Sequence, residues 1–129
     1  MIQINELRIG NLIQEGKIEQ IDNSIGEVYY SGDGYYQSNY CCNLNPIMLN
    51  EEWLLKFGFS VINESSAGKR YGYVINGVFS SDLTFTFWKT TKEAGKFFRG
   101  DLELKSVHQL QNIYFALVNS ELQLLEAGI

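Results

Sequence analysis

Two segments with helix signals, residues 50–58 and 106–119, constrain most strongly what this chain can fold into. Asn50 and Ser106 are residue types that cap helix N-termini, because their side-chain oxygens accept hydrogen bonds from unpaired backbone N–H groups. Apolar residues then recur with helical spacing in each segment, and Gly58 is placed to end the first helix. The sequence therefore predicts two helices, at about 50–58 and 106–119, each burying one face.

The rest of the chain has the pattern of short β-strands separated by turns. The simplest arrangement of the first forty or so residues is an antiparallel meander. Asn76 and Gly77 give the strongest hairpin signal, because this pair fits the tight turn between two strands. We expect an α+β fold in which residues 1–129 form a single domain, with twisted antiparallel sheet(s) of about six or seven short strands and two helices.

Charge is distributed unevenly between the two halves of the chain. Residues 1–64 contain nine acidic and three basic residues, whereas residues 65–129 contain six acidic and seven basic residues. The net charge of −5 is therefore concentrated in the first half, which disfavours general binding to nucleic acid. Such a surface suits a basic protein surface, for example a channel that normally holds nucleic acid. A solvated acidic surface explains the same counts.

The cysteines and the N-terminal residues predict a cytoplasmic protein. Cys41 and Cys42 are adjacent, and neighbouring cysteines rarely reach the geometry of a disulfide. Their spacing matches neither a zinc site nor a redox motif. Residues 2–13 include Glu6 and Arg8, so they do not form the apolar run of a signal peptide. We expect reduced thiols, no membrane span and no cofactor.

One pattern points to an enzyme. Asp82, followed by Glu103 and Lys105 and then by a helix, resembles the core of a large nuclease superfamily, in which carboxylates hold Mg²⁺ and a lysine stabilises negative charge. The Glu-x-Lys tripeptide is short, and alternating charges on the exposed face of a strand give the same letters. A Mg²⁺-dependent nuclease is therefore an alternative. The favoured expectation is a protein with no catalytic and no metal-binding residues.

Tyrosines cluster around a Gly-Asp-Gly turn within residues 27–42. Asp33, Tyr35, Tyr36 and Tyr40 lie in this segment, together with serine and asparagine. Recognition loops use this mixture, because tyrosine gives a large contact area at a small cost in conformational entropy. Tyrosines that simply cover a small sheet would give the same pattern. We predict these four residues to be partner-binding and leave both interpretations open.

A second candidate surface combines bases with aromatic rings. Trp88, Lys89, Lys92, Lys96 and Arg99 fall within one short run that also contains two phenylalanines. Lysine and arginine can contact phosphates, and an aromatic ring can stack on a base, as in proteins that bind single strands. A solvated loop beside core aromatics is the simpler interpretation. These five residues complete the predicted partner-binding set.

Three pieces of the sequence are similar to one known family. They are L-R-I-G-N-L at residues 7–12, L-N-P-I-M-L-N-E-E-W-L-L-K-F-G-F at residues 44–59 and S-V-H-Q-L-Q-N-I-Y-F-A-L at residues 106–117. In this order they resemble small uncharacterised proteins of phages, prophages and mobile elements of Bacteroidetes bacteria. The similarity covers the N-terminal strand and both predicted helices, and it does not extend over residues 64–100.

The resemblance implies an accessory factor of a phage or mobile element that acts in the cytoplasm of the host cell. Many such proteins bind and disable a host defence protein, and anti-CRISPR proteins are the prominent case. We therefore expect a non-enzymatic inhibitor of a host defence protein, with an RNA-guided nuclease effector or its guide-RNA complex as the partner. A structural or nucleic-acid-binding accessory protein of the phage is the other alternative.

Overall fold

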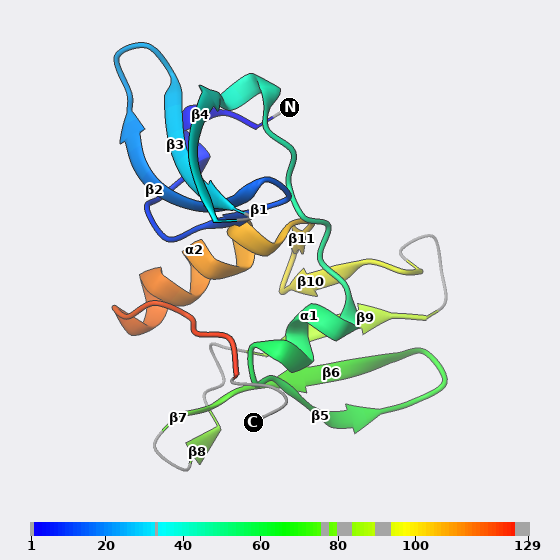
Figure 1. Cartoon of the computed structure of the whole chain (residues 1–129). Coiled ribbons are helices and arrows are strands. Elements are labelled where there is room, and N and C mark those ends of the chain that lie inside the picture. Colours follow the sequence, from blue (N-terminus) through cyan, green and yellow to red (C-terminus); the bar gives the residue numbers. More distant parts are fainter. Residues whose placement is uncertain (1, 33, 76–77, 80–83, 90–93, 126–129) are drawn as a thin grey trace. The chain divides into compact units, whose positions relative to one another are not determined.

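The computed structural model describes residues 2–32, 34–75, 78–79, 84–89 and 94–125 (Figure 1). The chain divides into two compact units. Unit 1 contains Met1–Met48 and Ser106–Glu121, and unit 2 contains Leu49–Lys105 and Leu122–Ile129. Each unit is therefore built from two separate stretches of the chain.

Unit 1 combines a four-stranded antiparallel sheet with the longer helix of the chain. The strands lie in the order β1-β2-β3-β4, so each pairs with its neighbour in sequence, and the predicted meander is confirmed. The elements of unit 1 are η1 (Ile4–Glu6), β1 (Leu12–Ile13), β2 (Gly16–Asp22), β3 (Glu27–Gly32), β4 (Tyr35–Tyr40), η2 (Cys41–Asn43) and α2 (Val107–Val118).

One face of the unit 1 sheet forms a core. The side chains of Ile18, Val28 and Tyr30 lie on this face and are almost completely buried. Successive side chains of a strand point to opposite faces, so the residues next to these three in each strand point away from the core. Leu110 and Tyr114 of α2 are buried as well. The alternation along β2 and β3 thus fixes which side chains remain outside.

Helix α2 begins and ends as its sequence predicts. The Ser106 Oγ accepts a hydrogen bond from the backbone N–H of Gln109 at 3.3 Å, which is the expected cap. At the other end Asn119 adopts the left-handed conformation with φ of 61°, and its N–H donates to the carbonyl of Phe115 at 2.8 Å. The helix predicted at 106–119 is confirmed as Val107–Val118.

A network of polar side chains fastens α2 to the N-terminal segment of unit 1. The Oδ1 of Asn112 accepts hydrogen bonds from the Arg8 guanidinium at 2.8 Å and from the Asn11 side-chain amide at 2.9 Å. The Nδ2 of Asn112 donates to the backbone carbonyl of Glu6 at 2.7 Å. Asn11 is fully buried, and this bonding offsets the cost of removing its amide from water.

Unit 2 is built on a five-stranded antiparallel sheet, coloured green to yellow in Figure 1. Its strand order is β11-β10-β9-β6-β5, and β7 and β8 form a separate pair. The elements of unit 2 are α1 (Glu51–Lys56), β5 (Ser60–Glu64), β6 (Gly68–Gly72), β7 (Val74–Ile75), β8 (Val78–Phe79), β9 (Phe85–Trp88), β10 (Phe97–Arg99) and β11 (Leu102–Leu104).

Aromatic rings form the core of unit 2. The ring centroids of Phe59 and Phe85 lie 5.3 Å apart in an edge-on arrangement, and those of Phe87 and Phe97 lie 4.7 Å apart. Tyr71 of β6 adds a fifth ring, 6.4 Å from that of Phe97. Such tilted and edge-on pairs are favourable because the ring edges are positive and the faces negative.

Helix α1 has the predicted cap but depends on contacts with the sheet. The Asn50 Oδ1 accepts from the backbone N–H of Trp53 at 2.9 Å. Glu51, in the first turn, accepts from the Lys69 ammonium at 3.0 Å and from the Tyr71 hydroxyl. A helix of six residues is not stable alone, so these contacts with β6 hold it in place.

Strands β7 and β8 flank the predicted hairpin turn. Val74 pairs with Phe79, and Ile75 pairs with Val78, in antiparallel register. The two strands of this hairpin are therefore confirmed. The turn residues Asn76 and Gly77 lie outside the described residues.

The predicted fold class is wrong. We expected six or seven strands and two helices, whereas the structure has a four-stranded sheet, a five-stranded sheet and one helix of several turns, α2. Strand β5 is exposed along its whole length, and β10 and β11 have three residues each, which is too short for alternation to predict a strand. The single domain over residues 1–129 stays a prediction.

Both α-helices are short. Helix α2 has 12 residues and α1 has six. Within the described ranges, neither has the length and apolar character that a membrane-crossing helix requires.

The network around Asn112 generates a stability prediction. Replacing Asn112 with alanine removes the acceptor of the buried Asn11 amide and one of the two partners of the Arg8 guanidinium, which keeps Glu121, so the free energy of unfolding should fall by about 1–3 kcal/mol. Chemical denaturation followed by circular dichroism measures this change. Asn23→Ala, at an exposed turn position, is the control and should change the free energy by less than about 0.5 kcal/mol. Equal effects of the two substitutions would contradict the role of the network.

Candidate functional site

The outward face of the unit 1 sheet displays tyrosines. On β3 and β4 the side chains of Tyr29, Tyr36 and Tyr40 point to the face opposite the core, because they alternate with the inward-pointing residues. The rings of Tyr29 and Tyr36 stack with centroids 6.0 Å apart and planes 19° from parallel. Tyr36 and Tyr40 are 60% and 52% exposed. We call these three residues the tyrosine face.

Carboxylates surround the tyrosine face. Strands β2, β3 and β4 together contain three acidic residues and one basic residue. Glu27 accepts a hydrogen bond from the Tyr29 hydroxyl at 2.6 Å, and Glu19 accepts from the Ser31 hydroxyl at 2.8 Å. The bond to the Glu27 carboxylate raises the pKa of Tyr29, so its hydroxyl stays protonated and neutral. The face therefore presents polar rings in a negative field, which suits a basic partner.

Strand β4 is also an edge of its sheet. It pairs with β3 on one side, and no described strand pairs with its other side. Most of its side chains are exposed. An edge strand leaves backbone N–H and C=O groups directed outward, where an extended segment of another protein can pair with them.

Three of the predicted tyrosine-segment residues lie on β4, but they do not share one face. Tyr36 and Tyr40 belong to the tyrosine face, whereas Tyr35 has the opposite parity and is 68% exposed beside the hairpin turn. Asp33 lies outside the described residues. The segment was predicted either to bind a partner or to cover a small sheet. Burial is consistent with each interpretation for part of the segment, because Tyr30 is in the core while Tyr36 is exposed.

The predicted basic-aromatic run belongs to unit 2, and its described bases are engaged. The Lys89 ammonium forms an ion pair with the Glu64 carboxylate, which lowers the pKa of Glu64. Lys96 and Arg99 also interact with other groups of the protein. Lys92 lies outside the described residues. The described bases of this run, Lys89, Lys96 and Arg99, therefore each interact with another group of the protein.

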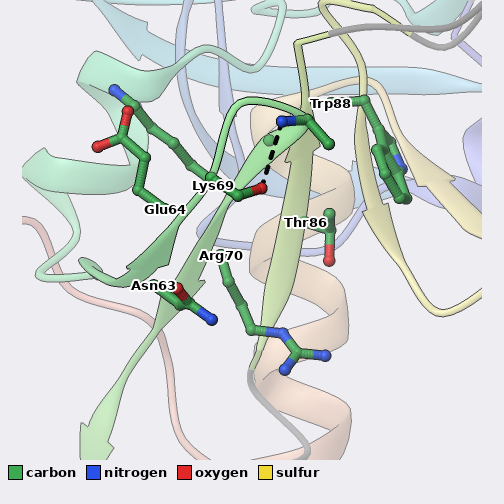
Figure 2. Close-up of a pocket in the computed structure, with 9 residues that line it drawn as sticks. Asn63, Glu64, Lys69, Arg70, Thr86 and Trp88 are labelled. Atoms are coloured by element: carbon green, nitrogen blue, oxygen red, sulfur yellow. Dashed lines mark hydrogen bonds between the residues drawn. The ribbon is translucent and has the colours of Figure 1, made fainter.

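A hollow of about 310 Å³ lies on the outward face of β5, β6 and β9 in unit 2 (Figure 2). Asn63, Arg70 and Thr86 stand opposite one another on these three strands, so their side chains form one row. Trp88 lies two residues beyond Thr86 on β9 and lines the same hollow. In Figure 2 Thr86 lies between the Arg70 guanidinium and the Trp88 ring.

A glycine keeps the floor of this hollow open beside Trp88. Gly68 of β6 is the residue directly opposite Trp88. A Cβ at Gly68 would lie 2.4 Å from the backbone oxygen of Phe87, so no side chain fits there without moving the strand. The close approach of the β6 and β9 backbones therefore requires glycine here, and Gly68 lines the hollow without a side chain.

Charges around the hollow are paired, with one exception among the described residues that line it. Lys69 is paired with Glu51 at 3.0 Å, and Glu64 is paired with Lys89. The Arg70 guanidinium makes no hydrogen bond or ion pair with any described residue, and its side chain is exposed. Among the described residues, the hollow is therefore lined by one uncompensated positive charge and by an aromatic ring.

Sequence reasoning included Trp88 but missed the other residues of this row. Asn63, Arg70 and Thr86 are separated along the chain, and only strand pairing brings them together. A bulge between Val61 and Asn63 further shifts the register of β5, so counting alternate residues would not place Asn63 on this face.

The described residues provide no cluster for a metal ion. Within the described ranges, no group of three or more His, Cys, Asp and Glu side chains is arranged to hold one. Glu103 lies on β11 and Lys105 follows it, while Asp82 lies outside the described residues. The nuclease alternative thus stays a prediction.

His108 is buried near the start of α2. Its Nε2 lies 3.6 Å from the Glu6 Oε1, and its Nδ1 is buried without a hydrogen-bond partner. Burial lowers the pKa of His108, although the nearby Glu6 carboxylate acts in the opposite direction. A neutral ring in the core is a structural group, and it has no nucleophile beside it among its described contacts.

Comparison of the chain with protein-family models, with curated proteins and with solved structures gives no match.

His108 generates a pH prediction. Its pKa is lowered in the folded state from the ordinary value of 6.5, so the unfolded chain binds the proton more readily just below pH 6.5. The free energy of unfolding should therefore fall as the pH is lowered from 7.5 to 5.5. Glu51 and Glu64 have lowered pKa values in the folded state, so their contribution to the free energy of unfolding is lost only at more acidic pH. His108→Gln should flatten the profile between pH 7.5 and 5.5 in thermal unfolding, and an unchanged slope would contradict the assignment.

Proposed function

We propose that this protein is a non-enzymatic accessory protein of a phage or mobile element that binds and inhibits a host defence protein. Its partner is an RNA-guided nuclease effector or the complex of that effector with guide RNA, which makes the protein an anti-CRISPR protein. The observation that carries the proposal is the tyrosine face beside the open edge of β4. The family resemblance of the three sequence segments supplies the biological context.

The tyrosine face has the chemistry of a protein-binding surface. Tyrosine is enriched among the residues that dominate binding energies, because it buries a large area and keeps a polar hydroxyl for hydrogen bonding. Stacking of Tyr29 on Tyr36 fixes both rings before a partner arrives, so less entropy is lost on binding. The face is thus prepared for contact in a way that scattered exposed apolar residues are not.

The acidic surroundings favour a basic partner. Grooves that hold guide RNA or target DNA are positively charged, since they bind phosphates. Glu19 and Glu27 next to the tyrosines would be attracted to such a groove and would accelerate association. Inhibition would then follow from occupation of the groove, without any chemical step.

The open edge of β4 supplies a second means of attachment. An extended segment of the partner could add a strand there, with main-chain hydrogen bonds giving affinity and the alternating side chains giving specificity. Trp88, Lys89, Lys96 and Arg99 stay proposed contacts for guide RNA. The ion pair of Lys89 with Glu64, and the interactions that engage Lys96 and Arg99, would have to open for these bases to take part.

The test uses the effector with its guide RNA from a Bacteroidetes host, purified and assayed for target cleavage with increasing amounts of this protein. Truncating both Tyr36 and Tyr40 to alanine should weaken inhibition and complex formation by more than about tenfold, because exposed tyrosines at an interface often contribute more than 1 kcal/mol each. Leu117→Ala, at an exposed position of α2, is the control and should inhibit as the wild type does.

Charge reversal provides an independent arm of the test. Replacing Glu19 and Glu27 with lysine should slow association and reduce its dependence on salt, whereas the folded state should persist because both carboxylates lie at the surface of the sheet. If the tyrosine pair and the charge-reversal pair both inhibit like the wild type, the proposal is overturned. Cleavage of nucleic acid by this protein with Mg²⁺, abolished by Glu103→Ala, would replace it with the nuclease alternative.

A further inference from the structure

We propose that the hollow on the outward face of β5, β6 and β9 is a binding site for single-stranded nucleic acid, in which Arg70 holds a phosphate and Trp88 stacks on the adjoining base. The site shares Trp88 with the proposed guide-RNA contacts, but it does not involve the tyrosine face and does not rest on inhibition of a defence protein. Figure 2 shows its principal side chains.

The first argument is the position of the positive charge. Arg70 projects into the hollow without a carboxylate partner among the described residues, while Lys69 and Lys89 are neutralised by Glu51 and Glu64. A guanidinium left unpaired on a protein of net charge −5 is available for an anion, and its fork of donors fits phosphate oxygens well.

The second argument is the spacing between the charge and the ring. Thr86 lies directly opposite Arg70, and Trp88 follows two residues later on the same face of β9. Residues placed diagonally across neighbouring strands in this way are about 7–8 Å apart. This spacing of the two backbone positions is of the order of the distance from a phosphate to its own base, and the Arg70 side chain extends the reach, so we expect one nucleotide to contact both Arg70 and Trp88.

The third argument is the composition of the remaining surface. Asn63 and Thr86 lie between and beside the two anchors and offer both donors and acceptors to a sugar or a base edge. Gly68 leaves the floor beside Trp88 bare, so a flat base can approach the indole face. The volume of about 310 Å³ is of the right order for one nucleotide.

The fourth argument extends the site beyond one nucleotide. Phe98 of β10 is the residue opposite Thr86 on its other side, and its half-buried ring lies on the same face as Trp88. Two neighbouring rings on an open sheet form a stacking platform for successive bases, as in proteins that bind single strands. Glu103 of β11 stands opposite Phe98 and continues the row across the sheet.

The test measures fluorescence anisotropy of a labelled eight-nucleotide single strand, as RNA and as DNA, titrated with the full chain at low salt. Both strands should bind, since stacking and a phosphate contact do not depend on the 2′-hydroxyl. Arg70→Gln should weaken binding about tenfold and reduce the slope of log K against log salt by about 0.7, the value for one phosphate contact with a single strand. Lys17→Gln is the matched control, because it removes the same charge from an exposed position of β2 and should leave binding unchanged.

The stacking contact has its own readout. Trp88→Ala should weaken binding about tenfold, and Trp88→Phe should retain most of the affinity while losing the quenching of tryptophan fluorescence that base stacking produces. Trp88→Phe preserves an aromatic ring on β9, so it keeps the test informative if the alanine variant is unstable.

Several outcomes would overturn the assignment. These are no binding of either single strand at low salt, wild-type affinity of both Arg70→Gln and Trp88→Ala, fluorescence quenching that persists in Trp88→Phe, or equal affinity for a duplex of the same length. If a free mononucleotide binds as tightly as the eight-nucleotide strand, the hollow is a site for a small ligand and the proposed binding of single-stranded nucleic acid is wrong. Loss of RNA binding in the Tyr36/Tyr40 alanine variant would place the strand on the tyrosine face instead of in this hollow.

Discussion

Each sheet of this protein has to bury one of its two faces, and that requirement decides which side chains are left for binding. In unit 1, burial of Ile18, Val28 and Tyr30 forces the alternate residues Tyr29 and Tyr36 to the outside. In unit 2, burial of the aromatic core places the row that contains Arg70 on the outer face of the sheet. In each unit the proposed binding surface is therefore the face of the sheet opposite its core.

Pairing of charges decides which of the exposed groups remain available to a partner. Lys89 attracts attention in the sequence, but its ion pair with Glu64 compensates it, and Lys69 is compensated by Glu51. Arg70 has no such partner among the described residues. A count of basic residues along the chain thus overstates the positive surface of the predicted run and overlooks the cation at the centre of the hollow.

Polar contacts within unit 1 play a different part, because they join segments that are far apart in sequence. Asn112 of α2 satisfies Arg8 and Asn11, and Gln111 accepts a hydrogen bond from the backbone of Leu12 at 2.8 Å. These bonds are directional, so they define one position of α2 against the N-terminal segment where apolar packing alone would allow several. The tyrosine face is displayed on a sheet that this network helps to hold.

Sequence by itself determined the local features of this protein. The preferences of a few neighbouring residues are enough to predict the caps at Asn50 and Ser106 and the course of α2. They also predict the meander of the first four strands and the strands flanking Asn76-Gly77. Tertiary structure decided the number of strands, because β5 is exposed along its whole length and β10 and β11 have only three residues each, so all three form through pairing with their neighbours. It also decided the hollow, since Asn63, Arg70, Thr86 and Trp88 meet only when β5, β6 and β9 pair in a register shifted by a bulge. Periodicity reports which face of an element is apolar, whereas the partner across a sheet depends on hydrogen bonds between distant segments, which local sequence does not encode.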